Sequence, residues 1–77
     1  MLHIRVYGNL IELFGQEAVT LPADQPWTVQ GVLAYLKQQQ PNLSLQQVRL
    51  AKNQELVNDG PISSSDELAL MPPFAGG

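Results

Sequence analysis

The sequence contains no cysteine, and this absence excludes several kinds of chemistry at once. A chain without a thiol forms no disulfide, offers no catalytic thiolate and ligates no iron–sulfur cluster. The single histidine, His3, also excludes a zinc site built from thiolates and imidazoles. We therefore expect no metal site, and any sulfur that this protein handles must be carried on something other than a cysteine side chain.

Positive charge and long hydrophobic runs are scarce as well. Four Lys and Arg stand against seven Asp and Glu, for a net charge of −3 and a pI near 4.7. Because the basic residues are scattered, no phosphate-neutralising stripe is predicted, and nucleic acid is not an expected partner. A spanning helix needs roughly 20 apolar residues, so no membrane contact is expected either. The alternating start of the chain does not resemble a signal peptide. We expect a cytoplasmic protein.

Two short strands are predicted in the first part of the chain. Leu2, Ile4 and Val6 alternate with other residues over positions 2–7, the pattern of a strand with one buried face, and Gly8-Asn9 ends this strand. Residues 10–14 fit a short helical turn ended by Gly15, and residues 17–21 fit a second strand stopped by Pro22. Their close spacing predicts an antiparallel hairpin with a longer connection.

One amphipathic helix is predicted in the middle of the chain. Residues 23–27 are expected to form a loop, and Thr28 is a suitable N-cap. The helix then carries an apolar stripe at the spacing i, i+3, i+4 and i+7, and Pro41 with Asn42 ends it. The stripe consists of Val29, Val32, Leu33 and Leu36.

Three strands are predicted after this helix, over residues 48–51, 55–57 and 67–71, with Asn53-Gln54 as the turn between the first two. Ile62 is expected to enter the core from a loop. The element order predicts an α+β domain of the β-grasp type. It has a mixed sheet of about five strands, one main helix across one face, and parallel first and last strands at its centre. We predict a folded domain over residues 1–71 and an extended tail over residues 72–77.

The tail is the most informative part of the sequence. Pro72 and Pro73 restrict the backbone to extended conformations, so this segment is expected to project from the sheet. Gly76 and Gly77 lack a Cβ and form the slimmest possible peptide, able to enter a narrow channel. A stiff spacer that ends in a slim carboxylate suits a protein in which that carboxylate is the reacting group.

These features are similar to those of the small subunit of molybdopterin synthase, in the ThiS/MoaD family of ubiquitin-like sulfur carriers. The similarity covers essentially the whole chain and is most specific over residues 66–77, which read DELALMPPFAGG. Residues 10–15 and 52–55 also match family segments. Two residues depart from the family pattern: Ile11 replaces an arginine, and Lys52 replaces an aliphatic residue. The first departure puts in doubt a charged partner contact at that position.

The resemblance implies a subunit that is not catalytic alone. A ubiquitin-activating-type enzyme would use ATP to adenylate the Gly77 carboxylate, and a persulfide sulfur donor would convert it to a thiocarboxylate (C-terminal 1-thioglycine). The carrier would then give its sulfur to cyclic pyranopterin monophosphate within the large subunit, in a heterotetramer of two small and two large subunits. The chain itself would bind no cofactor. The residues implied to contact partners are Met71, Pro72, Pro73, Phe74, Ala75 and Gly76.

Several alternatives stay open from the residues alone. The thiamine-pathway sulfur carrier, a ubiquitin-like protein modifier and a plain β-grasp interaction module would share much of this pattern. Met71 is predicted to face away from the core, where it either joins a partner interface with Phe74 or fills a second small apolar cluster. Asp66 and Glu67 form either a solvated turn or an acidic contact for a partner. His3 is expected on the sheet surface.

Overall fold

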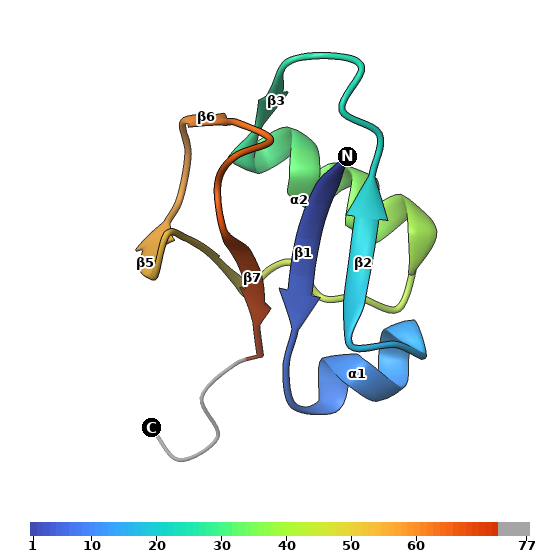
Figure 1. The fold of residues 1–77 in the computed structure, drawn as a ribbon. Helices are drawn as coiled ribbons and strands as arrows, with labels where there is room; N and C mark the ends of the chain where they lie inside the picture. The colour runs from blue at the N-terminus through green and yellow to red at the C-terminus, as the bar shows by residue number, and fades with distance from the viewer. Residues whose placement is uncertain (73–77) are drawn as a thin grey trace.

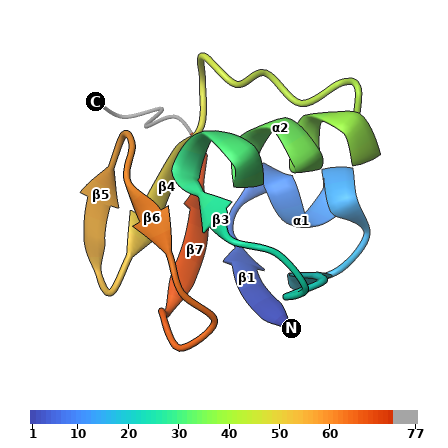
Figure 2. The same cartoon turned by 90° about the horizontal axis from the view of Figure 1, so that it is seen from above.

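The computed structural model describes residues 1–72 of the chain. They form a mixed five-stranded sheet in the order β2-β1-β7-β4-β5, and helix α2 (Val29–Gln39) crosses one of its faces (Figures 1 and 2). The predicted α+β fold of the β-grasp type is confirmed. The other elements of this sheet and its first connection are β1 (Leu2–Val6), α1 (Asn9–Phe14), β2 (Ala18–Leu21), β4 (Arg49–Lys52), β5 (Glu55–Val57) and β7 (Leu68–Met71).

The first hairpin forms as predicted, with α1 in its connection. β1 and β2 are antiparallel, and His3 lies opposite Thr20. Helix α1 ends at Gly15, which adopts a left-handed conformation (φ 72°, ψ 16°) and donates its N–H to the Ile11 carbonyl at 2.8 Å. Glycine is favoured at this position because a side chain raises the energy of a left-handed backbone.

The first and last strands lie side by side at the centre of the sheet. β1 and β7 are parallel, with Arg5 opposite Ala69, as the β-grasp arrangement requires. β7 pairs on its other side with the antiparallel strand β4, where Ala69 lies opposite Ala51. The strand that leads into the C-terminal tail is therefore held by hydrogen bonds on both of its edges.

Helix α2 begins and ends on specific polar contacts. Thr28 is the N-cap, as predicted, and its hydroxyl accepts the N–H of Gly31 at 3.0 Å. The helix ends at Gln39, and the ammonium of Lys37 then donates to the carbonyls of Pro41 (2.7 Å) and Leu43 (2.6 Å). These contacts satisfy carbonyl groups that follow the last helical turn.

A second, two-stranded sheet differs from the prediction. β3 (Trp27–Thr28) pairs antiparallel with β6 (Pro61–Ile62), so Ile62 enters the core from a short strand rather than from a loop. Its predicted burial is confirmed. A pairing between two-residue strands so far apart in sequence leaves no periodic pattern to detect.

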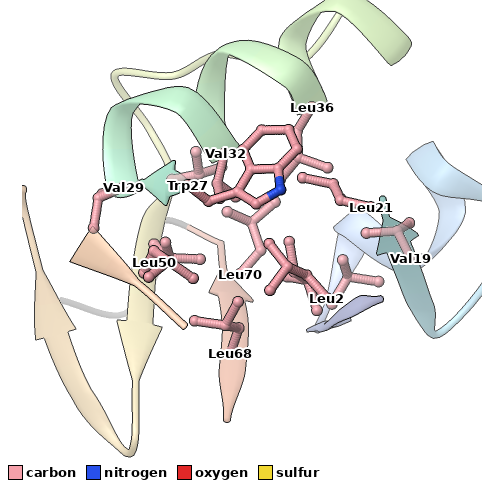
Figure 3. Packing of buried hydrophobic residues seen from close by; sticks show 14 of the residues in the cluster. Leu2, Val19, Leu21, Trp27, Val29, Val32, Leu36, Leu50, Leu68 and Leu70 are labelled. Atoms are coloured by element: carbon pink, nitrogen blue, oxygen red, sulfur yellow. The ribbon is translucent and has the colours of Figure 1, made fainter. Parts of the chain in front are cut away.

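The core lies between α2 and the inner face of the sheet (Figure 3). β1, β2 and β7 supply alternate residues to it, and no polar side chain is buried among the described residues. Within that same part of the chain, no helix is both long and apolar enough to cross a membrane. The largest side chains that are almost fully buried are Leu2, Ile4, Leu21, Leu36, Leu43, Leu50 and Leu70.

Candidate functional site

The described part of the candidate site is the end of β7. The predicted reacting residue, Gly77, and the predicted partner-contact residues 73–76 lie outside the described residues. Met71 and Pro72 are described, and Met71 lies opposite Arg49 of β4 in the sheet register. The tail is thus attached to a central strand of the sheet, which pairs with β1 as far as Leu70 and with β4 as far as Met71.

Met71 lies on the outer face of the sheet, away from α2. Leu68 and Leu70 are buried in the core, whereas Ala69 and Met71 alternate with them and are half-buried. The prediction that Met71 faces away from the core is confirmed. Of its two predicted environments, the described residues show the small apolar cluster, which lies on the surface. We call this cluster the outer-face patch; it is lined by Tyr7, Ala51, Gln54, Leu56, Ala69 and Met71.

The outer-face patch includes two large apolar side chains that are exposed. Leu56 is 52% exposed and Tyr7 is 40% exposed, and both are among the few large hydrophobic residues in contact with solvent. Ala51 and Ala69 are register partners in the sheet and also line the patch, where their short side chains project little. Exposed apolar and aromatic side chains beside one another are typical of protein–protein contact surfaces.

A more polar groove adjoins the patch on the same face. Its walls include His3 and Arg5 of β1 on one side, and Asp66 and Glu67 before β7 on the other. His3 lies on the exposed face of its strand, as predicted. Because charges of both signs line this groove, it does not form a surface of one sign that would attract nucleic acid.

Asp66 and Glu67, which precede β7, differ in their contacts. Asp66 accepts the backbone N–H of Ser63 at 2.7 Å and the side-chain amide of Asn53 at 3.1 Å. These two hydrogen bonds, with a smaller contribution from the positive charge of Lys52, lower the pKa of Asp66 below the ordinary aspartate value. Asp66 thus stabilises a turn within the protein, and Glu67 is left as the exposed carboxylate of the pair.

The two departures from the family pattern have structural explanations. Ile11 is half-buried and packs against the core, so its position on α1 offers an apolar rather than a charged surface. Lys52 is half-buried at the end of β4, and its ammonium donates to the carbonyl of Pro61 at 3.2 Å. The long lysine stem occupies the place of an aliphatic residue while its charged end reaches a backbone acceptor.

Gly8 belongs to the site, although the sequence singled it out only as the end of the first strand. It adopts φ 62° and ψ −138°, a conformation that residues with a side chain rarely adopt. A Cβ on Gly8 would lie 3.1 Å from Cγ and 3.7 Å from Cβ of Pro72. The backbone of the β1–α1 connection therefore lies against the first residue of the tail.

Metal chemistry finds no support in the described residues. Across residues 1–72, no three side chains of histidine, aspartate or glutamate lie close enough together to hold an ion. What the described site offers is a fixed attachment point for the tail, beside an exposed apolar patch.

Comparisons with known proteins agree with this geometry. Residues 4–77 match the ThiS family. The molybdopterin synthase sulfur carrier subunit of Escherichia coli is 34% identical to the chain, over the full length of both proteins. The crystal structure of SAMP1 from Haloferax volcanii superposes with a TM-score of 0.78, at 26% identity, and covers 99% of this chain and 98% of that one. SAMP1 of Methanosarcina acetivorans, a small archaeal modifier protein, has the same fold, with a TM-score of 0.73 at 18% identity over 99% of this chain and 95% of that one.

Proposed function

The chain belongs to the ThiS family, and from this premise we propose that it is the sulfur-carrier subunit of a molybdopterin synthase. In this proposal the carboxylate of Gly77 is adenylated, becomes a thiocarboxylate and gives its sulfur to cyclic pyranopterin monophosphate. The observation that carries the proposal is the full-length identity of 34% with the sulfur carrier subunit of Escherichia coli molybdopterin synthase. The Gly-Gly ending and the absence of cysteine support the same chemistry.

The proposed chemistry follows from the weak reactivity of a carboxylate. An adenylating partner joins the Gly77 carboxylate to AMP and releases pyrophosphate, which gives the carbonyl carbon a good leaving group. The outer sulfur of a donor persulfide attacks that carbon and expels AMP. A thiol of the partner then attacks the donor's sulfur in the resulting acyl disulfide, forms a disulfide with it and releases the thiocarboxylate. Because this chain has no cysteine, every thiol in the sequence of reactions comes from a partner.

The fold supports a role as a rigid handle for a reactive end. β7 pairs with β1 as far as Leu70 and with β4 as far as Met71, so displacement of this strand requires both ladders to open. Pro72 follows directly and fixes its own φ. A carrier of this design presents its tail from a defined point to two successive partners, the adenylating enzyme and the large subunit of the synthase.

The outer-face patch supports the proposed association with those partners. It lies immediately beside the start of the tail and combines the side chains of Tyr7, Leu56 and Met71. These three side chains are of the kind that forms the apolar centre of an interface, which a surrounding polar rim completes. We propose that the large subunit covers this patch in a heterotetramer of two small and two large subunits, and that ATP is bound by the adenylating partner.

The experiment that tests the proposal is intact mass spectrometry of the chain. Incubation with ATP, a sulfur donor and the adenylating enzyme should raise its mass by about 16 units, the difference between sulfur and oxygen. Deletion of Gly77 should abolish the gain and leave the circular dichroism spectrum unchanged. Full molybdopterin formation by the shortened chain would overturn the proposal.

A second candidate function is that of a ubiquitin-like protein modifier. The specific observation in its favour is the similarity to SAMP1 of Haloferax volcanii, at a TM-score of 0.78 and 26% identity. A modifier forms isopeptide bonds between Gly77 and lysines of other proteins, whereas a carrier ends as a thiocarboxylate. Recovery of many covalent conjugates from the native host would favour the modifier. A chain that restores thiamine rather than molybdopterin synthesis would indicate the thiamine-pathway carrier.

A further inference from the structure

We propose that Gly8 is a positioning residue for the C-terminal tail. In this inference, which rests on the proposed function, the bare backbone of Gly8 forms the surface against which Pro72 packs. It thereby sets the position of the Pro72 carbonyl to which residues 73–77 are attached. Gly8 is not a catalytic residue, because its contact is with Pro72 and not with the reacting carboxylate.

The first argument is the closeness of the approach. A Cβ on Gly8 would lie 3.1 Å from Pro72 Cγ, a distance tighter than most Cβ contacts in proteins. A second contact, of 3.7 Å to Pro72 Cβ, involves the same ring. The proline ring is bonded to the backbone at both Cα and N, so its Cγ can shift only by a change of ring pucker and cannot swing aside as the end of a long side chain would. A side chain at position 8 must therefore displace either Pro72 or the β1–α1 connection.

The second argument is that the backbone of Gly8 is itself suited only to glycine. Its φ of 62° with ψ of −138° is the mirror image of an extended conformation and brings a side chain into steric conflict. The Gly8 carbonyl also accepts the N–H of Ile11, in the first turn of α1, at 3.1 Å. The position of Gly8 is thus fixed by the helix that follows it.

The third argument is the place of this contact in the sheet. Gly8 follows β1 and Pro72 follows β7, and these two strands are parallel partners, with Val6 opposite Leu70. The segments that follow these two strands therefore leave the same end of the sheet next to each other (Figure 1). The pairing of β1 with β7 brings Pro72 to this point, and the Gly8 backbone then limits where its ring can lie.

The chain provides a matched control for a substitution at Gly8. Gly15 also has a positive φ, of 72°, but a Cβ there would meet nothing within 4 Å. Gly15→Ala therefore introduces backbone strain near α1 without touching Pro72. Both Gly8→Ala and Gly15→Ala are expected to lower the melting temperature, by roughly 5 °C or more for a domain of this size.

The readout is carboxylate adenylation, followed as exchange of pyrophosphate into ATP by the adenylating enzyme of the same organism. We expect Gly8→Ala to lower kcat about tenfold, because a small displacement of a reacting group has a large effect on rate. KM should change less than about twofold, since the surface that docks on the enzyme is retained. Gly15→Ala should keep the wild-type kcat. Equal kcat values for Gly8→Ala and the wild type would overturn the inference.

A double-mutant cycle separates the contact from backbone strain. Pro72→Ala removes Cγ, so Gly8→Ala combined with Pro72→Ala should lose less kcat than the product of the two single losses. Losses that simply multiply would show that Gly8 and Pro72 act independently and would overturn the inference. The cycle of Gly15→Ala with Pro72→Ala should show no coupling.

A further pair of variants keeps the test valid if Gly8→Ala does not fold. Pro72→Val retains Cγ atoms beside the native Gly8, and Pro72→Ala does not, so the valine variant should keep at least a threefold higher kcat. Equal kcat values for the two would overturn the inference. If the wild-type chain is not adenylated at all, the proposed function itself fails. If the wild type and Gly8→Ala are adenylated equally well, the proposed function stands and only the inference about Gly8 fails.

Discussion

Asn53 and Asp66 join the β4–β5 turn to the loop that precedes β7: Asn53 Nδ2 donates to Asp66 Oδ1 at 3.1 Å. The side-chain oxygen of Asn53 accepts the N–H of Glu67 at 2.9 Å, and the backbone N–H of Asn53 donates to the Glu67 carbonyl at 2.8 Å. β7 is thus fixed at its start by this polar cluster, and Pro72, the residue after its end, lies against Gly8. Both ends of the strand that carries the tail are set by residues distant in sequence.

The Asp66 carboxylate predicts a pH dependence of stability. Its folded-state pKa is lowered, first by the hydrogen bond from Ser63 and then by that from Asn53. The unfolded chain therefore binds more protons near the folded-state pKa, and stability rises with pH in that range. The contribution of Asp66 is fully present above about pH 4 and is lost as the pH falls through the lower, folded-state pKa.

Melting temperatures of the wild type and Asp66→Asn between pH 2 and 7 check this prediction. The difference between the two proteins should be largest near neutral pH and should shrink in acid, where Asp66 is protonated. Glu67→Gln is the matched control, because this exposed carboxylate accepts no hydrogen bond from the described residues. A difference for Asp66→Asn that stays constant across the pH range would contradict the assignment.

The β4–β5 turn predicts a stabilising substitution. Asn53 and Gln54 both have positive φ, of 52° and 73°, as a two-residue type I′ turn requires. Asparagine tolerates this conformation, but glutamine is strained in it. Gln54→Gly creates the favoured Asn-Gly turn and should raise the free energy of unfolding by about 0.5–1 kcal/mol. Urea unfolding measures the change.

Replacement of Asn53 by glycine separates its two roles. Asn53→Gly keeps a backbone suited to positive φ but loses the side-chain bonds to Asp66 and Glu67. We expect a loss of about 1–2 kcal/mol, because these groups are exposed and water replaces part of each bond. Asn53→Ala should lose more, since it adds backbone strain. Equal stability of the two variants would refute the role assigned to the positive φ.

Neighbouring residues of β7 should respond very differently to truncation. Leu70 is fully buried against α2, so Leu70→Ala should cost about 2–5 kcal/mol through lost burial and a cavity. Met71 is half-buried on the outer face, and Met71→Ala should cost less than about 1 kcal/mol. Chemical denaturation of both variants provides the comparison. A larger loss for Met71→Ala would mean that its face of the sheet is the better-packed one.

We expect two contacts of Trp27 to stabilise the connection before α2. Its indole N–H donates to the Pro22 carbonyl at 2.7 Å, and its ring meets that of Tyr35 edge-on, with centroids 5.5 Å apart. Trp27→Phe keeps an aromatic ring but removes the donor, and should cost about 1–2 kcal/mol. Tyr35→Leu is the complementary variant, because it removes the ring pair and keeps the hydrogen bond. Thermal unfolding followed by circular dichroism measures the stability of both variants. An unchanged stability of Trp27→Phe would show that the hydrogen bond from Trp27 to Pro22 does not stabilise the protein.

Much of the fold was predictable because local patterns agree with the tertiary structure. Alternation over residues 2–6 identified the buried face of β1, and Thr28 marked the start of α2. The spacing of Val29, Val32 and Leu36 identified the buried side of that helix. These signals need only the neighbouring residues, since the periods of strands and helices are set by backbone geometry. The pairing of β3 with β6 escaped prediction because it depends on contacts between distant segments.

The sequence by itself limited the side-chain chemistry that is open to this protein. With no cysteine and one histidine, sulfur has no side-chain thiol to occupy, and the Gly-Gly ending directs attention to the carboxylate of Gly77. Only the tertiary structure decided which residues surround the start of the tail. Tyr7, Leu56 and Met71 meet on the outer face because β1, β5 and β7 belong to one sheet, and Gly8 meets Pro72 because β1 and β7 are parallel neighbours. Strand order is fixed by burial across the whole core, a property that no short segment of the chain contains.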